Sequence, residues 1–207
     1  MLHVREPVLE PVSIEGLRPT QLAVGMREVE EKRKRLRERK RKKLGKYVGE
    51  HMIPVVLGPK GRHYIVDHHH LALALLKEGW RDVLVTVMSD LSALDADAFW
   101  VVLDHRNWVY LYDAGGRRRE FSDLPKSVTG LQDDPFRSLA GELRRAGAFA
   151  KDTTPYSEFL WADFLWRRMK RKAVEADFAA AKTEALRLAR SKDAQYLPGW
   201  CGLKDDA

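Results

Sequence analysis

The sequence predicts an α+β fold, with a small mixed sheet and helices over residues 1–90 and a mostly helical region over residues 91–207. Three short runs of β type lie in the first part, at residues 53–57, 63–66 and 82–88. A helix-forming stretch separates the last two, and helical segments opened by Pro follow one another from about residue 123. Strands early in the chain and helices late in it are typical of the α+β class.

Turn residues and hydrophobic periodicity predict the elements of the first part. Residues 58–61, Gly-Pro-Lys-Gly, connect two apolar runs as a hairpin. Residues 68–79 are apolar nearly all round, which predicts a buried helix that ends at Gly79. The strand at 82–88 is apolar at successive positions, so we expect both of its faces to be covered.

A strongly basic helix is predicted over residues 26–46, after a strand at 10–14 and a turn whose Thr20 is expected to cap the helix. Residues 27–46 hold twelve Lys or Arg and four Glu, a net charge of +8, whereas the rest of the chain holds 25 basic and 26 acidic residues. The basicity therefore belongs to one element. It suits contact with nucleic acid, an anionic surface or an acidic partner. Because aromatic residues for base stacking are absent, a solvated surface helix is the simpler interpretation.

The second part is predicted to be helical apart from one hairpin. A helix is expected over residues 91–105, and a hairpin from strands at 108–112 and 117–121. Three further helices are expected: one opened by Asp134-Pro135, one opened by Thr154-Pro155 and a basic, Ala-rich one at 171–190. The aromatic residues near Asp163 are interpreted as core, with Asp163 as a secondary candidate for a polar site.

Composition narrows the class of protein. The chain of 207 residues contains one cysteine, Cys201, which excludes an internal disulfide and suits a reducing cytoplasm. Its apolar runs are far shorter than a membrane-spanning helix, and no signal-peptide pattern begins the sequence. We therefore expect a cytoplasmic protein without a membrane partner. The sequence specifies no oligomeric state.

The most informative stretch joins a β-type run to the helix at 68–79 through Asp67, His68, His69 and His70. A strand that stops where a helix starts leaves unpaired backbone N–H groups at the junction, and the helix dipole adds positive potential there. Such a corner suits a phosphate or a carboxylate. Histidines beside it bring proton transfer near neutral pH or metal binding.

The motif at residues 61–70, Gly-Arg-His-Tyr-Ile-Val-Asp-His-His-His, resembles the signature of the ParB/sulfiredoxin superfamily. Residues 14–21 are similar to the first strand and Pro-containing turn of that superfamily, and residues 82–88 to its next strand. The second half, through residues 123–127 and 161–164, is similar to the branch named ParB-like nucleases. The resemblance implies a ParB/sulfiredoxin-like sheet with helices over residues 1–90.

The resemblance also implies roles for individual residues. Asp67 matches the acid of the motif, while His69 and His70 match its two histidines. Glu28 is similar in position to the general base of the free-serine kinases in this superfamily, with Glu31 as the other possibility. The sequence departs from the motif twice: His68 stands where Gly is usual, and Leu71 stands where Arg is usual. The implied catalytic set is Asp67, His69, His70 and Glu28, with His68 binding phosphate.

A second group of candidates lies at Lys126, Ser127, Arg137 and Ser138. The helix opened by Asp134-Pro135 offers another anion-receptive end, and the Arg137 guanidinium can bind phosphate in a bidentate manner. If the second half folds over the histidine corner, Lys126, Arg137 and Ser138 could replace the arginine lost at Leu71.

The expected cofactor is a nucleotide with Mg²⁺, the metal being shared by Asp67 and the phosphates. A structural zinc site is not favoured, because adjacent histidines do not share a helix face.

The sequence leaves three functions open. The leading one is an enzyme acting on a phosphate ester, by nucleotide-dependent phosphoryl transfer or by hydrolysis, with a nucleotide or small phosphorylated molecule as partner. The second is a nuclease or DNA-binding protein that uses the basic helix at 27–46. The third is a non-catalytic ligand-binding module that kept the fold. Fold alone does not choose among them.

Overall fold

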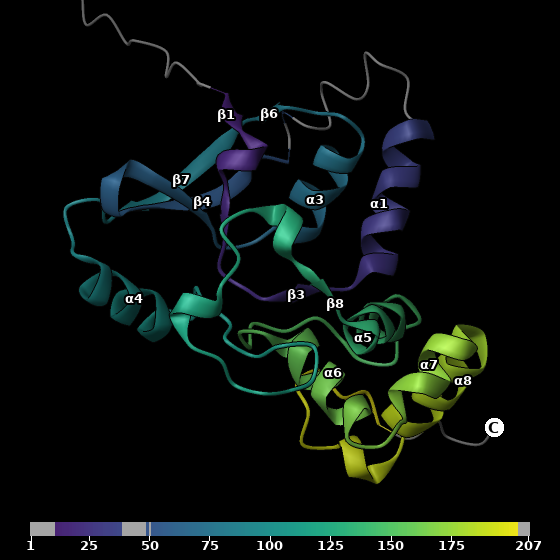
Figure 1. Cartoon of the computed structure of the whole chain (residues 1–207). Coiled ribbons are helices and arrows are strands. Elements are labelled where there is room, and N and C mark those ends of the chain that lie inside the picture. Colours follow the sequence, from purple (N-terminus) through teal and green to yellow (C-terminus); the bar gives the residue numbers. More distant parts are fainter. Residues whose placement is uncertain (1–10, 39–48, 50, 203–207) are drawn as a thin grey trace, which may run out of the picture. The chain divides into compact units, whose positions relative to one another are not determined.

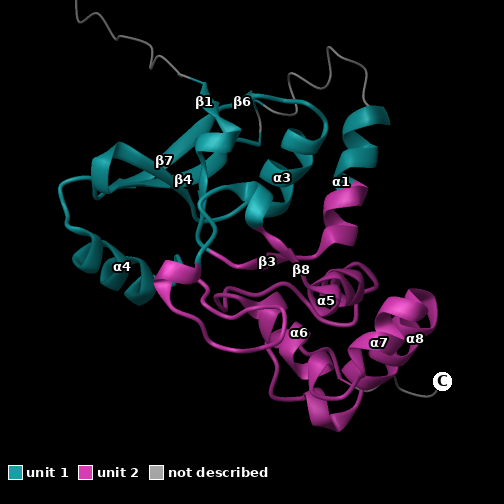
Figure 2. Ribbon diagram, viewed as in Figure 1, with its two compact units in different colours: residues 1–20, 32–109, 124–130 teal, residues 21–31, 110–123, 131–207 magenta. Residues whose placement is uncertain are grey.

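The computed structural model describes residues 11–38, 49 and 51–202 (Figure 1). The chain forms two compact units that interleave along the sequence (Figure 2). Unit 1 comprises residues 1–20, 32–109 and 124–130, and unit 2 comprises residues 21–31, 110–123 and 131–207. Within the described residues, none of the helices combines the length and apolar character needed to cross a lipid bilayer.

Unit 1 is built on a four-stranded mixed sheet of order β2-β5-β4-β7. Its strands are β2 (Arg18–Pro19), β5 (Arg62–Ile65), β4 (Ile53–Gly58) and β7 (Val85–Asp90). The β4–β5 pair is antiparallel, whereas β2–β5 and β4–β7 are parallel. A separate antiparallel pair joins β1 (Val12–Ser13) to β6 (Asp82–Val83), and the 3-10 segment η1 (Ile14–Gly16) follows β1. The α+β class with a small mixed sheet, predicted from the sequence, is confirmed.

The predicted hairpin at residues 53–66 is also confirmed. The 3-10 turn η2 (Pro59–Gly61) connects β4 to β5, with positive φ angles at Lys60 and Gly61. At Gly58, an added Cβ would lie 2.6–2.7 Å from the rings of Tyr64 and Phe99, so only glycine lets these rings pack so closely. Phe99 belongs to α4 (Ala96–His105), which the Asp95 carboxylate caps by accepting the Ala98 N–H.

The predicted buried helix appears as α3 (His69–Lys77), whose residues from His69 to Leu75 are all buried. The next stretch corrects the sequence prediction, because residues 82–88 do not form one doubly covered strand. The chain divides at Leu84 into β6 and β7, which belong to different sheets. Since β7 is an edge strand, Val87 and Met88 remain 48% and 55% exposed.

The basic helix is seen as α1 (Met26–Glu38), which buries Val29 and Leu36 along a narrow stripe. The rest of the predicted helix, to residue 46, extends outside the described residues. The prediction that Thr20 caps this helix is wrong. The N–H of Met26 donates to an Asp133 carboxylate oxygen instead, and the Thr20 hydroxyl donates to the carbonyl of Ile65.

Unit 2 is mostly helical. The short parallel pair β3 (Ala23–Val24) and β8 (Gln132–Asp133) precedes α5 (Pro135–Arg145), α6 (Ser157–Trp166), α7 (Arg171–Ala176) and α8 (Phe178–Ala189). Short 3-10 turns lie at η3 (Phe121–Asp123) and η5 (Lys192–Ala194). The predicted helix at 171–190 is two helices, because Asp177 leaves the helical conformation and caps α8. The predicted hairpin at 108–121 reduces to one bridge between Tyr112 and Arg118.

The core of unit 2 forms around α5, α6 and α8. Trp161 is fully buried and stacks on Phe149 with ring centroids 4.5 Å apart. Its indole N–H donates to the Pro198 carbonyl, which satisfies the polar end of the ring. The interpretation of the aromatic residues of α6 as core holds for Trp161 and Phe164, but Trp166 keeps exposed surface.

Candidate functional site

The strand–helix corner predicted from the sequence is present in unit 1. β5 ends at Ile65 and α3 begins at His69, so Val66, Asp67 and His68 form the connection between them. One carboxylate oxygen of Asp67 accepts the backbone N–H of His68 at 2.6 Å. The first N–H groups of α3 have no acceptor within the helix, as at the start of any α-helix.

His68 adopts a left-handed backbone conformation, with φ of 64° and ψ of 23°, immediately before α3. Glycine adopts this conformation without cost, whereas histidine is one of the few other residues found there with some frequency. The geometry therefore explains why Gly is usual at this position of the motif and how His68 can replace it. The Nδ1 atom of His68 is buried and makes no hydrogen bond to any described residue.

His69 joins the start of α3 to the end of β2. Its Nε2 atom accepts the backbone N–H of Thr20 at 3.1 Å, and the Thr20 hydroxyl donates to the Ile65 carbonyl at 2.6 Å. Burial lowers the pKa of His69 to about 4. The ring is therefore neutral near pH 7 and carries its proton on Nδ1, because Nε2 serves as the acceptor.

The remaining two positions of the motif are both buried but differ in chemistry. His70 is 9% exposed and lies in the first turn of α3. Leu71 is 3% exposed and belongs to the buried apolar surface of the helix. An arginine at position 71 would have to bury its guanidinium among apolar side chains, which costs free energy, whereas leucine packs there without that cost.

Lys126 and Ser127 lie in the same unit as the corner. They precede the 3-10 turn η4 (Val128–Gly130), which packs against both α3 and η1. Lys126 is exposed, whereas Val128 is fully buried and anchors the segment. The structure thus brings the segment that carries Lys126 against the helix that carries the histidines.

Arg137, Ser138 and Glu28 belong to unit 2. Arg137 is 7% exposed, and its guanidinium contacts the carboxylates of Glu28, at 3.4 Å, and of Glu158. Ser138 is fully enclosed and lies against Gly25, where an added Cβ would come within 2.8 Å of the serine oxygen. The structure therefore pairs the proposed phosphate-binding arginine with the proposed general base.

Thr20 belongs to the corner, although the sequence predicts it as a helix cap. It lies 45 residues from Ile65 and 49 from His69, so neither hydrogen bond has a local sequence signal. The sequence places Thr20 directly after Pro19, at the start of a predicted turn. For metals, the described part of the chain contains no group of three or more His, Cys, Asp or Glu side chains arranged to hold an ion. A metal at Asp67 would need further ligands from a substrate.

Comparison with known proteins found one matching family model and similar solved structures. The family model described as "Putative ParB-like nuclease" matches residues 10–167. The chain is also similar to the crystal structure of protein Atu1540 from Agrobacterium tumefaciens, with 52% sequence identity and a TM-score of 0.88. That similarity covers 96% of this chain and 100% of the other. No match was found among curated proteins.

Proposed function

The chain belongs to the family described as putative ParB-like nucleases, and on that premise we propose that it hydrolyses a phosphate ester of a nucleotide or nucleic acid at the N-terminal end of α3. The observation that carries the proposal is the left-handed turn at His68. It joins β5 directly to the anion-receptive end of a helix whose first residues are histidines. Proton-transfer groups and a phosphate-binding corner thereby occur in one short segment.

The roles at this corner follow from exposure and hydrogen bonding. His69 supports the site by joining α3 to Thr20, because its low pKa and its occupied Nε2 make it a poor proton carrier at neutral pH. We assign the proton-transfer steps to His70 and metal binding to Asp67. His68 contacts the phosphate, and Lys126, on the segment packed against α3, adds positive charge in place of the arginine absent at position 71.

Mg²⁺ fits this assignment as a partner of the substrate. Magnesium is commonly bound by one or two carboxylates together with phosphate oxygens, and Asp67 supplies one carboxylate. When bound, the ion would neutralise charge on the phosphate. Glu28 is not used in the proposal, because it pairs with Arg137 in unit 2.

Nucleic acid is the substrate class that the family suggests, and α1 supports it. Lys34, Arg35 and Arg37 are exposed on this helix. Each phosphate that such residues neutralise steepens the dependence of affinity on salt. We therefore expect DNA or RNA binding to weaken strongly between about 50 and 200 mM salt.

The test is a hydrolysis assay with bis(p-nitrophenyl) phosphate and with labelled DNA and RNA oligonucleotides, in Mg²⁺ and in EDTA. The variants are His70→Ala and Asp67→Asn, and the matched control is His105→Ala, an exposed histidine at the end of α4. We expect kcat/KM to fall about a hundredfold or more for the first two and to stay unchanged for the control. Wild-type rates in both corner variants would reject the corner as the site.

A binding measurement separates a non-catalytic protein from an enzyme. Thermal stabilisation by a mononucleotide that needs His68 and Lys126, without turnover of any substrate, would favour the ligand-binding alternative. Turnover that depends on His70 favours hydrolysis.

A further inference from the structure

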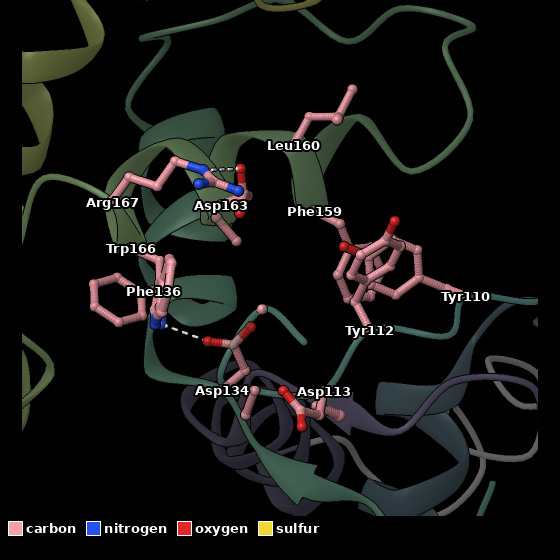
Figure 3. A pocket seen from close by; sticks show the side chains of 14 residues that line it. Tyr110, Tyr112, Asp113, Asp134, Phe136, Phe159, Leu160, Asp163, Trp166 and Arg167 are labelled. Carbon is pink, nitrogen blue, oxygen red and sulfur yellow. Dashed lines mark hydrogen bonds and ion pairs between the residues drawn. The ribbon is translucent and has the colours of Figure 1, made fainter. Parts of the chain in front are cut away.

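Unit 2 contains a cavity of about 250 Å³, and none of the residues that line it belongs to the histidine motif (Figure 3). Its walls come from the segment at 110–116, the start of α5 and the length of α6. Tyr110, Tyr112 and Phe159 line one side as a group of packed rings, with centroids 4.0 Å apart for Tyr110 and Phe159 and 5.3 Å apart for Tyr110 and Tyr112. Trp166 contributes a fourth aromatic surface.

The polar groups of this cavity are predominantly acidic. Asp113, Asp134 and Asp163 line it, against a single guanidinium, that of Arg167. Asp163 pairs with Arg167 at 2.8 Å, and Asp113 pairs with Arg119 at 2.9 Å. These two carboxylates are therefore largely neutralised by their partners. Figure 3 shows the carboxylates of Asp134 and Asp163 on opposite sides of the open space, with the rings of Tyr112 and Phe159 beside it.

Asp134 differs from the other two acids. It is 8% exposed and caps α5, where one carboxylate oxygen accepts the Phe136 N–H at 2.9 Å. Burial raises its pKa to about 6, although the Arg137 and Arg171 charges act in the opposite direction. A buried carboxylate with so high a pKa gains stabilisation from any cation that reaches it.

We propose that this cavity binds a small organic cation, whose amine or amidinium group donates hydrogen bonds to Asp134 and whose apolar part packs against the aromatic rings. Aromatic faces and a carboxylate together are the usual surroundings of such a cation in proteins. The ionised carboxylate of Asp134 in the lining disfavours phosphates and carboxylates. The volume lies just below the range of about 300–1,000 Å³ for drug-sized ligands, which limits the ligand to roughly one ring and its charged group.

Isothermal titration calorimetry at pH 7.5 with three ligands of one shape tests the proposal: benzamidine, which is cationic, benzamide, which is neutral, and benzoate, which is anionic. We expect benzamidine to bind at least tenfold more tightly than benzamide, and benzoate to give no binding heat. Equal affinity for benzamidine and benzamide would overturn the proposal, as would the absence of benzamidine binding up to about 10 mM, a concentration that exceeds any useful affinity for a site of this kind.

The decisive variant is Asp134→Asn, because asparagine keeps the helix-capping function and removes the charge. The matched control is Asp177→Asn, which makes the same change at the exposed cap of α8, away from the cavity lining. Benzamidine affinity should fall about tenfold to a hundredfold in the first variant and stay unchanged in the second. Wild-type affinity in Asp134→Asn would reject the site. If that variant folds poorly, Tyr112→Ala provides the test. Tyr112 is 41% exposed, so its replacement removes one aromatic wall of the cavity at little cost to folding. Unchanged benzamidine affinity in this variant overturns the proposal.

Discussion

Replacing Arg137 by methionine tests whether this arginine is held for structure or for ligand binding. Its side chain is 8% exposed, and its two carboxylate partners, Glu28 and Glu158, are 11% and 14% exposed. Methionine fills a similar volume but leaves the buried acids without this positive charge. Glu158 keeps a second contact to Arg144 at 2.8 Å, so the replacement leaves this acid with one positive neighbour.

The expected magnitude follows from the cost of breaking a buried ion pair. Removing one partner of such a pair typically costs about 3–5 kcal/mol, because the remaining charge stays in a poorly solvated place. Arg137→Met should therefore lower the free energy of unfolding by about 3–5 kcal/mol, measured by urea denaturation followed by circular dichroism. The added substitution Glu28→Gln should recover at least about 1 kcal/mol, because it removes the negative charge of one of the two buried carboxylates that Arg137 contacted.

Arg187→Met is the matched control. This arginine pairs with Glu184 on α8, but the two side chains are 67% and 45% exposed, so water replaces the lost contact. We expect a change below about 0.5 kcal/mol. If Arg137→Met also loses less than about 1 kcal/mol while phosphate-ester hydrolysis is abolished, the structural interpretation is refuted and a direct role in substrate binding is supported.

Three further changes have definite expected outcomes. His69 has a pKa of about 4 in the folded protein and about 6.5 in the unfolded chain. The free energy of unfolding should therefore be highest above pH 6.5 and fall by up to about 3 kcal/mol towards pH 4. His69→Gln should flatten this pH dependence in a series of urea melts. Asp134 has a raised pKa, so its ionised form opposes folding at pH 7. Asp134→Asn should therefore raise the free energy of unfolding by about 1–3 kcal/mol at that pH. A gain that persists below about pH 4, where the carboxyl is protonated in both states, would contradict this explanation. His68→Gly removes the cost of a left-handed histidine, so the free energy of unfolding should stay equal or rise by up to about 1 kcal/mol, with a matching change in the thermal midpoint. A clear drop in the midpoint would show that the imidazole ring itself stabilises the corner.

Sequence patterns located the elements whose signals are local. Gly-Pro-Lys-Gly predicted the β4–β5 hairpin, and Asp134-Pro135 predicted the start of α5, because turn and cap chemistry act over a few residues. The strand–helix corner was predicted for the same reason. The exposure of β7 was not, since an apolar alternation cannot tell an edge strand from a central one.

Contacts between residues far apart in the sequence could not be predicted from local patterns. Glu28 and Arg137 are 109 residues apart, and each was assigned separately to a phosphate site. Tyr110 and Phe159 meet as stacked rings across 49 positions without any shared motif, so the cavity they line had no sequence signal. The roles of Asp67, His68, His70 and Lys126 in catalysis or binding stay predictions for the assays above.

The way in which the chain alternates between its two units has a practical consequence for protein engineering. It passes from one to the other five times, and α1 carries residues of both. A fragment ending at residue 90 would omit residues 91–109 and 124–130 of unit 1 while retaining residues 21–31 of unit 2. Neither half can therefore be transplanted as a contiguous module, and chimaeras with relatives should exchange whole chains or individual side chains.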